Sequence, residues 1–330
     1  MSLRVVQVVH KQFPSVGGIE KHVYELQNNL DADVKVISPG RFSFKLPFFS
    51  FVIIAPLLPF RLWKEEADIY CSHGYGSLMP FYTAIVAWLK RKPFVFTIHG
   101  YPSGEGFKRF ALWFYEQTFA RVILAVATKV IAVTPIPISK ELNIIGNGVY
   151  EMPYCGDGDC LVYVGRLDKD KRVDWVVRAG AKLGRKVLIV GPDDGAKEEL
   201  KELANLLGAD VEFMEVHPDK ISSVYARASA VVLPSKYEGF SLVWLEAMGS
   251  GVPVFSTPVG EAPSLFSKVY GQSAINYIFT NEGRLVRCLR KERNEKVLRR
   301  AREKIQKDYR WSIVAEKTME VYRDACEVYR

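Results

Sequence analysis

The sequence predicts two α/β domains, each built on a parallel sheet with helices on both faces. Short apolar runs of strand length alternate with segments of helical periodicity through most of the chain. The alternation stops at a polar, glycine-bearing stretch, residues 150–159, and then restarts. The 330 residues suffice for two domains of ordinary size. In open α/β sheets ligands bind beyond the carboxyl ends of the strands, so the loops that follow strands are where chemistry is expected.

The first half of the chain predicts one complete doubly wound domain. The expected strands are residues 3–9, 34–38, 69–72, 94–98 and 130–133, and the expected helices are residues 19–30, 78–90 and 107–127. A turn at residues 14–18 joins the first strand to the first helix.

The same alternation returns after the linker. The expected strands are residues 161–164, 186–190, 211–214, 230–233 and 254–256, and the expected helices are residues 173–183, 196–207 and 221–228. A further helix follows residue 241 and is stopped by Gly249, Gly251 and Pro253. We therefore expect domains at residues 1–152 and 153–310, followed by a closing helix at residues 311–330.

Composition limits the classes of function. Hydrophobic residues make up 48% and charged residues 25%, which is typical of a globular chain. The net charge of +8 is concentrated in residues 284–307, which carry eleven Lys or Arg and three Glu. This segment predicts a basic helix whose apolar stripe is Val297, Leu298, Ala301 and Ile305. It is either a solvated helix face or a nucleic-acid site, and because no nucleic-acid motif accompanies it we expect no nucleic-acid partner.

The cysteines indicate a reducing, cytoplasmic compartment. Five are scattered along the chain without a Cys-x-x-Cys pair or a Cys/His cluster in sequence, so we expect no structural zinc. Pairing of Cys155 with Cys160 stays open. The chain enters a strand at once, so no signal peptide is expected.

Residues 46–60, LPFFSFVIIAPLLPF, are the most apolar stretch. They are shorter than the roughly 18 residues of a membrane span and are interrupted by prolines. Basic residues flank them on both sides. They are either an interfacial element that touches lipid headgroups at the inner membrane face or a buried helix with an apolar groove.

Two loops of the first domain carry candidate binding residues. Gly17 and Gly18 precede a helix after the first strand, where a ligand can approach the backbone and the helix dipole favours an anion. They do not form a dinucleotide or Walker fingerprint. His99 follows the strand 94–98, where it either contacts a phosphate or sugar hydroxyl or serves the structure. His73, after the strand 69–72, is a weaker candidate, and His22 is weaker again.

A glycine and two cations follow the first strand of the second domain. Gly165 leads into Arg166 and Lys171. Arginine offers a rigid fork of donors and lysine a compact charge, so the pair suits a diphosphate. Solvent-exposed charges without a ligand are the alternative.

The stretch Pro234–Pro253, PSKYEGFSLVWLEAMGSGVP, combines a turn, a helix N-terminus and two carboxylates. Backbone N–H groups of Ser241, Leu242 and Val243 are expected to point at a phosphate. Glu238 is placed to reach sugar hydroxyls, and Glu246 to accept from a ribose. Each acid, taken alone, is equally compatible with a helix surface. The donor-binding stretch we expect is Glu238, Gly239, Phe240, Ser241, Leu242, Val243 and Glu246.

Together these loops resemble the retaining glycosyltransferases of the two-domain Rossmann-like (GT-B) fold, in particular glycosyltransferase family four. The matching segments are Gly17-Gly18-Ile19-Glu20, Thr97-Ile98-His99-Gly100, Asn147-Gly148-Val149, Gly165-Arg166-Leu167 with Lys171, and EGFSLVWLEAMGSGVPV. They occur in order over nearly the whole chain, including the tail WSIVAEKTMEVY. The resemblance implies a closing helix that crosses back to the first domain, and a cleft between the domains.

The resemblance also implies a nucleotide-diphospho-sugar donor held mainly by the second domain. Arg166 and Lys171 would neutralise the leaving diphosphate in place of a metal, so no metal or other cofactor is expected to be essential. Glu238 would contact the sugar, with His99 and the Gly17-Gly18 loop closing over the donor. Transfer to a glycan or lipid-linked acceptor would retain the anomeric configuration without a protein nucleophile.

The chain departs from the family pattern at several positions. Arg172 and Glu215 stand where glycines are common, Gly146 where proline is common, and Gly260-Glu261 holds one glycine where two are common. These departures affect the expected base and sugar preference rather than the reaction class. A sugar-nucleotide epimerase and a non-catalytic sugar-nucleotide-binding protein on the same fold are the alternatives.

Overall fold

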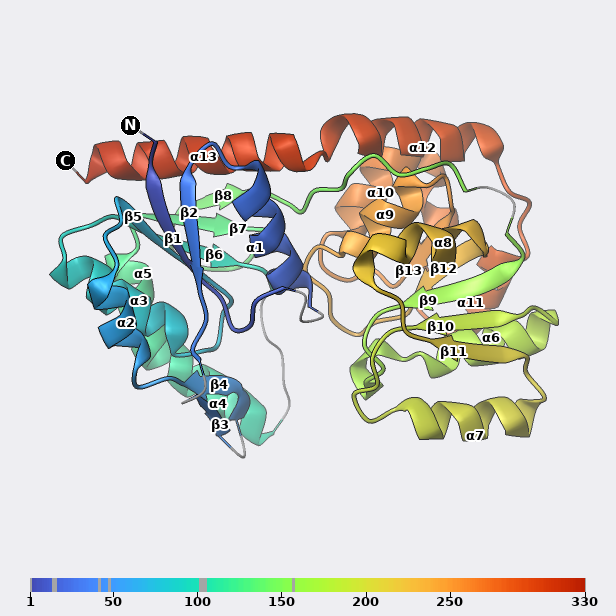
Figure 1. Ribbon diagram of the computed structural model, residues 1–330. Coiled ribbons are helices and arrows are strands. Elements are labelled where there is room, and N and C mark those ends of the chain that lie inside the picture. The colour runs from blue at the N-terminus through green and yellow to red at the C-terminus, as the bar shows by residue number, and fades with distance from the viewer. Residues whose placement is uncertain are drawn as a thin grey trace. The chain divides into compact units, whose positions relative to one another are not determined.

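The computed structural model describes residues 2–13, 17–40, 43–46, 49–100, 106–155 and 158–329. The chain divides into two compact units, Met1–Gly148 with Trp311–Arg330 (unit 1) and Val149–Arg310 (unit 2). Each unit is built on one parallel sheet with helices packed against it (Figure 1). The predicted fold class, two parallel-sheet α/β domains, is confirmed.

The sheet of unit 1 has the strand order β2-β1-β5-β6-β7-β8, and all neighbours are parallel. Its strands are β1 (Arg4–Val8), β2 (Asp33–Ile37), β5 (Ile69–His73), β6 (Phe94–Ile98), β7 (Lys129–Ala132) and β8 (Leu142–Ile144). The first five were predicted within one or two residues, whereas β8 was not. Strand order reverses between β1 and β5, which is where an open sheet of this kind binds its ligand.

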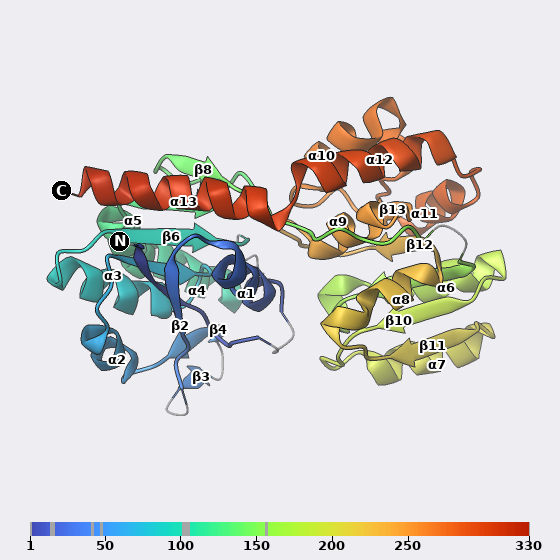
Figure 2. The same ribbon diagram turned by 45° about the horizontal axis from the view of Figure 1, so that its top comes forward.

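The helices of unit 1 cover the two faces of this sheet separately. Helix α1 (Gly18–Asn29) packs on α13 (Trp311–Val328), which also contacts β6. Helices α3 (Met79–Leu89) and α5 (Arg121–Val126) pack on the opposite face (Figures 1 and 2). The predicted helix at residues 107–127 is a run of α4 (Phe107–Tyr115), a π-helical turn at Glu116–Ala120 and α5.

Side-chain alternation gives the two faces different characters. Val6, Val8, Tyr70, Phe94 and Phe96 point into a core shared with α3 and α5. The residues between them point the other way, because side chains alternate along a strand. Cross-strand pairing places Gln7 beside Cys71 and His73 beside Thr97 on that second face. We call these four residues the polar face of the sheet.

The apolar stretch at residues 46–60 is not one helix. It contributes to an antiparallel hairpin, β3 (Phe44–Leu46) and β4 (Phe49–Ile54), and then to the short helix α2 (Leu58–Lys64). The buried-helix interpretation was therefore wrong for its first half, where β-branched and aromatic residues favour a strand. Residues 47 and 48 lie outside the described residues, as do residues 14–16 of the predicted turn.

The sheet of unit 2 has the parallel order β11-β10-β9-β12-β13. Its strands are β9 (Cys160–Val164), β10 (Val187–Val190), β11 (Val211–Met214), β12 (Ala228–Leu233) and β13 (Val254–Ser256). The helices are α6 (Asp174–Leu183), α7 (Lys197–Leu207), α8 (Ile221–Ala226), α9 (Leu242–Gly249), α10 (Ala262–Tyr270), α11 (Glu282–Leu289) and α12 (Glu295–Asp308), with 3-10 turns at Lys169–Lys171, Pro218–Lys220 and Gly271–Asn276. Strand order reverses between β9 and β12.

The basic segment at residues 284–307 folds as parts of two helices, α11 and α12, rather than as one. Asn294 begins the second helix, and its side chain accepts a hydrogen bond from the Val297 amide at 3.2 Å. Leu298, Ala301 and Ile305 of the predicted stripe are buried, whereas Val297 is only partly buried. Cys155 and Cys160 are both free thiols. Among the described residues, no helix combines the length and apolarity needed to cross a membrane.

Candidate functional site

The loops that follow β9 and β12 meet at the switch point of unit 2. The first begins at Gly165, whose φ of 152° suits glycine, and whose N–H donates to the Val190 carbonyl at 2.9 Å. A Cβ added at Gly191 would lie 2.0 Å from the Gly165 carbonyl oxygen. Glycines therefore let the loops after β9 and β10 approach each other closely. This packing fixes the position of the loop after β9, which contains Arg166 and Lys171.

Lys171 is positioned by the backbone of that loop. Asp168 begins the 3-10 turn Lys169–Lys171, and its carboxylate accepts from the amides of Asp170 at 2.9 Å and Lys171 at 3.2 Å. The Lys171 Nζ then lies 2.6 Å from Glu238 Oε1, with side chains only 19% and 18% exposed. Ser235 Oγ donates to the same oxygen at 2.9 Å. Lys171 and Glu238, which the sequence identifies in separate motifs, therefore form one ion pair. The pair is largely shielded from water, so the attraction between its charges is stronger than at the protein surface.

The neighbouring Arg166 is more exposed. Its guanidinium contacts Asp194 at 2.7 Å and Asp168 at 3.6 Å, and about half of the side chain remains in solvent. Screening weakens the exposed pair with Asp194, so this arginine can exchange that carboxylate for another anion at little cost.

The turn that carries Glu238 rests on a neighbouring loop. Gly260, at φ 51°, faces the Glu238 and Gly239 carbonyls so closely that an added Cβ would lie 2.2–2.3 Å from their oxygens. The Glu261 amide donates to the Gly239 carbonyl at 3.0 Å. The single glycine at Gly260-Glu261 is thus enough to seat this turn.

Helix α9 starts where the sequence placed it. Ser241 precedes its first residue with an extended backbone and without a side-chain cap, while Leu242 and Val243 are partly exposed. Phe240 is buried against Trp244 and Tyr309. The amides of the first turn therefore remain oriented along the helix axis toward its N-terminus, the arrangement that binds anions.

Glu246 is not a surface residue. It is 6% exposed, and its Oε2 accepts a hydrogen bond from Tyr225 of α8 at 2.8 Å. Burial, together with the adjacent carboxylate, raises the pKa of Tyr225 well above 10. The helix-surface interpretation was therefore wrong for Glu246. Its place beside a nucleotide ribose stays a prediction.

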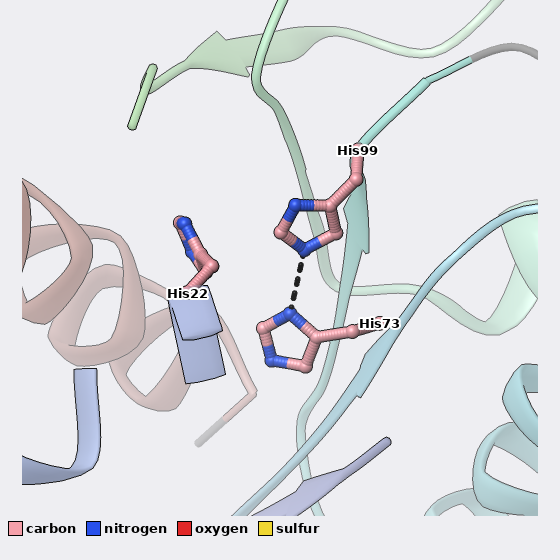
Figure 3. Close-up of side chains that lie close together, drawn as sticks. All are labelled: His22, His73 and His99. Atoms are coloured by element: carbon pink, nitrogen blue, oxygen red, sulfur yellow. Dashed lines mark hydrogen bonds between the residues drawn. The ribbon is translucent and has the colours of Figure 1, made fainter. Parts of the chain in front are cut away.

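In unit 1, three histidines converge (Figure 3). His73 ends β5, His99 follows β6, and His22 lies on α1. His73 Nδ1 and His99 Nε2 are hydrogen-bonded at 3.0 Å, and His22 Nδ1 bonds Asn147 Oδ1 at 2.8 Å. One ring nitrogen from each histidine lies within 4.8 Å of the other two. We call His22, His73 and His99 the histidine cluster.

Burial keeps the histidine cluster neutral. It lowers the pKa of His22 to about 4, against a smaller opposing effect of the Asn147 hydrogen bond. Burial likewise lowers the pKa values of His73 and His99 well below 6.5, and the other imidazoles act in the same direction. The cluster lies at the end of the polar face, and its members are polar but uncharged near neutral pH.

The Gly17-Gly18 loop is described only from Gly17 onward. Gly17 has extended backbone angles, and its carbonyl accepts from the Lys21 amide at 3.1 Å. A Cβ at Gly18 would meet nothing within 4 Å among the described residues. Gly18 thus has open space beside it, as ligand approach requires.

Sequence reasoning underrated several residues. From the sequence alone, His22 and His73 are weak candidates. However, His73 and His99 lie at the ends of neighbouring parallel strands, and this arrangement predicts that their side chains are close together. Asn147, Asp168 and Tyr225 were given no role, because each acts on another residue rather than on a ligand. His99, Gly17 and Gly18 belong to unit 1, whereas Arg166, Lys171, Glu238 and Glu246 belong to unit 2.

Comparisons with known proteins also identify glycosyltransferases as relatives of this chain. Residues 16–136 match the family described as Glycosyltransferase Family 4, and residues 158–282 match Glycosyl transferases group 1. An uncharacterized glycosyltransferase of Methanocaldococcus jannaschii is 28% identical over 191 residues, 52% of this chain and 46% of that protein. The D-inositol 3-phosphate glycosyltransferase of Nocardia farcinica is 39% identical over 114 residues, 30% of this chain and 25% of that protein. The chain thus matches less than half the length of these relatives.

Solved structures share the fold over the full length. HepE of Anabaena, in complex with UDP and glucose, superposes with a TM-score of 0.76 at 17% identity, covering 98% of this chain and 100% of the other. A sucrose-phosphate synthase of Thermosynechococcus elongatus has a TM-score of 0.74 at 17% identity, covering 99% of this chain and 100% of the other. These likenesses establish the two-domain GT-B fold.

Proposed function

The chain belongs to the glycosyltransferases of group 1 and family 4, and from this premise we propose that it transfers a sugar from a nucleotide-diphospho-sugar to an acceptor hydroxyl. The observation that carries the proposal is the Lys171–Glu238 pair at the switch point of unit 2. The Lys171 ammonium and the Glu238 carboxylate are 2.6 Å apart. The first is suited to the negative charge of a diphosphate and the second to the hydroxyls of the sugar next to it.

The diphosphate of the donor is assigned to Arg166, Lys171 and the first turn of α9. Arg166 is half exposed, and its shorter ion pair is with the exposed Asp194, so a phosphate can take the place of that carboxylate. The α9 amides add a partial positive charge without a mobile side chain. HepE, which shares the fold, was solved with UDP-glucose, which supports a nucleotide sugar as the donor class here.

The proposed reaction needs no metal and no protein nucleophile. The bond between the anomeric carbon and the phosphate oxygen breaks, and its electron pair stays on the diphosphate, where Arg166 and Lys171 stabilise the charge. Glu238 stabilises the positive charge that develops on the sugar. The acceptor oxygen bonds the anomeric carbon on the face that the diphosphate leaves, and its proton passes to a phosphate oxygen. The anomeric configuration is thereby retained.

His99 is assigned to the donor sugar and Gly17-Gly18 to the donor backbone contacts, as the resemblance implies. The neutral imidazole of His99 is partly exposed and can donate or accept a hydrogen bond with a sugar hydroxyl. Glu246 is assigned to the ribose. Its Oε2 accepts the hydrogen bond of Tyr225, which holds the carboxylate in position.

The acceptor is proposed to be a glycan or a lipid-linked hydroxyl, with the protein working at the inner membrane face. Exposed aromatic side chains on α2 and α4 support this, because aromatic residues are enriched where proteins touch lipid headgroups. They are Phe60, Trp63, Phe110, Trp113 and Phe114. Basic residues Arg61 and Lys64 end the same α2 helix.

The epimerase and binding-protein alternatives are not favoured by the family. They are separated from transfer by one experiment, in which the purified chain is screened by thermal shift against UDP-, GDP- and ADP-sugars and the stabilising donors are then incubated with glycan and lipid-linked acceptors. We expect one base to raise the unfolding temperature, since a ligand that binds only the folded state stabilises it. Product with a retained anomeric centre, formed in EDTA, is the expected result; interconverted donor without transfer would contradict the proposal.

A further inference from the structure

We propose that the histidine cluster of unit 1 is a binding site for a divalent transition-metal ion of the Zn²⁺ class. His22, His73 and His99 come from a helix and two strand ends, and one nitrogen of each lies within 4.8 Å of the others. Their ring centroids are 4.6, 5.3 and 5.9 Å apart, so the rings surround a common point rather than stack in a row (Figure 3).

One of the nitrogen–nitrogen distances is close to that around a coordinated ion, and the others are at most 4.8 Å. Zinc–nitrogen bonds of about 2.0–2.1 Å in a tetrahedral arrangement place neighbouring nitrogens about 3.4 Å apart. His73 Nδ1 and His99 Nε2 are 3.0 Å apart. A metal ion would replace this hydrogen bond after the two rings separate by a few tenths of an ångström, which side-chain rotation supplies.

The surroundings resemble the outer shell of a metal site. The Asn147 Oδ1 accepts from His22 Nδ1, which fixes the hydrogen on that nitrogen and leaves the Nε2 lone pair for a ligand. Trp311 packs edge-on against the same ring, with centroids 5.5 Å apart. His22 is therefore oriented by two contacts that do not use its second nitrogen.

Buried polar atoms beside the cluster point to a ligand in the same region. Gln7, His73 and Thr97 of the polar face are at most 1% exposed. The Gln7 amide atoms, His73 Nε2 and Thr97 Oγ1 find no hydrogen-bond partner among the described residues. Buried polar groups in native proteins normally have a partner, and water bound with the ion, rather than the ion itself, would supply it.

The donor set selects the metal. Three imidazoles without a carboxylate suit Zn²⁺, Co²⁺, Ni²⁺ or Cu²⁺, and do not suit Mg²⁺ or Ca²⁺, which need oxygen ligands. Three histidines also leave one position open for water or another ligand. His99 is the partly exposed member, so an ion enters from its side.

Metal binding would withdraw His99 from any other partner. The site itself does not rest on the proposed transfer activity, but if His99 contacts the donor sugar, the metal and the donor compete for one imidazole. The expected consequence is that micromolar Zn²⁺ inhibits transfer while EDTA leaves it unchanged. Binding and inhibition are separate measurements, so failure of one is distinguishable from failure of the other.

The test is titration of the full-length, chelator-treated chain with Co²⁺, followed by its visible absorption, because tetrahedral Co²⁺ with nitrogen ligands has an intense signature. We expect saturation at one ion per chain and displacement of the colour by Zn²⁺. His73→Gln and His99→Gln should each weaken binding at least 10-fold. Asn147→Ala should weaken it about 10–100-fold by releasing the His22 ring.

His217→Gln is the matched control, because His217 is exposed in unit 2 and pairs with Asp219. It should bind like the unaltered chain. Circular dichroism and the unfolding temperature identify any variant that fails to fold, and His99→Gln, the least buried change, then decides. Absence of the Co²⁺ spectrum in the unaltered chain, or its persistence at full affinity in His99→Gln, would overturn the proposal.

Discussion

The two units place different chemistry at the same position of the same kind of sheet. At the switch point of unit 2, side chains are charged, paired and partly open, as in Lys171 with Glu238 and Arg166 with Asp194. At the switch point of unit 1, they are buried, polar and neutral, as in His73 and Gln7. One fold therefore supports an electrostatic site and an uncharged hydrogen-bonding site, depending on which residues end its strands.

The electrostatic site should be the more sensitive to loss of a single charge. Lys171→Ala removes a cation and leaves Glu238 unpaired, so we expect transfer to fall about 100–1,000-fold in kcat/KM. Lys236→Ala is the control, since Lys236 is exposed nearby and its ammonium group pairs with Asp170 at 3.5 Å. Steady-state kinetics with the best donor gives the comparison, and equal losses in both variants would place the effect outside the Lys171–Glu238 pair.

The neutral site should be the more sensitive to acid. The folded-state pKa of His22, about 4, is below the unfolded value of about 6.5, so the folded state binds fewer protons between these values. The unfolding free energy of unit 1 therefore has its full value above pH 6.5 and decreases as the pH falls toward 4. His22 alone accounts for a decrease of about 2–4 kcal/mol. Chemical unfolding at several pH values measures this slope.

His22→Gln removes one of the three histidines with lowered pKa values, so it should reduce the pH slope without abolishing it. His217→Gln should leave it unchanged. An unchanged slope in His22→Gln would show that protonation of His22 does not contribute to the acid response of unit 1, which would contradict the prediction.

Backbone packing in unit 2 can be tested at a glycine. Gly260→Ala places a Cβ 2.2 Å from the Gly239 carbonyl oxygen, so the turn that carries Glu238 must shift. We expect a loss of about 2–3 kcal/mol in unfolding free energy together with reduced transfer. Gly208→Ala is the control, because Gly208 has a similar φ of 61° but an added Cβ would meet none of the described residues within 4 Å.

Gly208→Ala should cost only the left-handed backbone penalty of about 1–2 kcal/mol and leave transfer intact. Denaturant unfolding and kinetics on both variants separate the two effects. If Gly260→Ala and Gly208→Ala had equal stability and activity, the loop at Gly260 would have to change its conformation without moving Glu238.

The smallest effect is expected at Arg172. This residue has φ 50°, a left-handed conformation that glycine adopts without strain. Arg172→Gly relieves that strain but loses the guanidinium contact to the Trp175 ring, 5.0 Å away. A net gain of about 0.5 kcal/mol in the unfolding free energy is expected. A loss above that size would show that the Trp175 contact outweighs the backbone strain.

Regular elements were predictable because their patterns are local. Strands such as β6 and β13 are short apolar runs, and the sequence placed their ends correctly. Strand β8 escaped prediction because Leu142–Ile144 is partly exposed and lacks an apolar run. The left-handed backbone of Arg172 also has no local signal, because arginine is not selected for that conformation.

The site residues were predictable one at a time, and their pairing was not. Each of Lys171, Glu238 and His99 follows a strand, which the sequence reveals. That Lys171 meets Glu238 depends on the order β9-β12, and that His22 meets His73 depends on how α1 lies on the sheet. Such contacts arise from long-range packing, for which a single sequence has no periodic signature.

Because helix α13 belongs to unit 1 but follows unit 2 in the sequence, unit 1 is completed last during synthesis. Trp311 packs against His22, and Gly148 lies so close to it that a Cβ would be 2.7–2.9 Å from Trp311 atoms. The ribosome must first translate Val149–Arg310, all of unit 2, which takes roughly 10–30 s at ordinary elongation rates. Until then the polar face of the unit 1 sheet lacks one of its two covering helices. A chain that ends after Arg310 and has been released from the ribosome should therefore carry a protease-resistant unit 2 and a protease-sensitive unit 1.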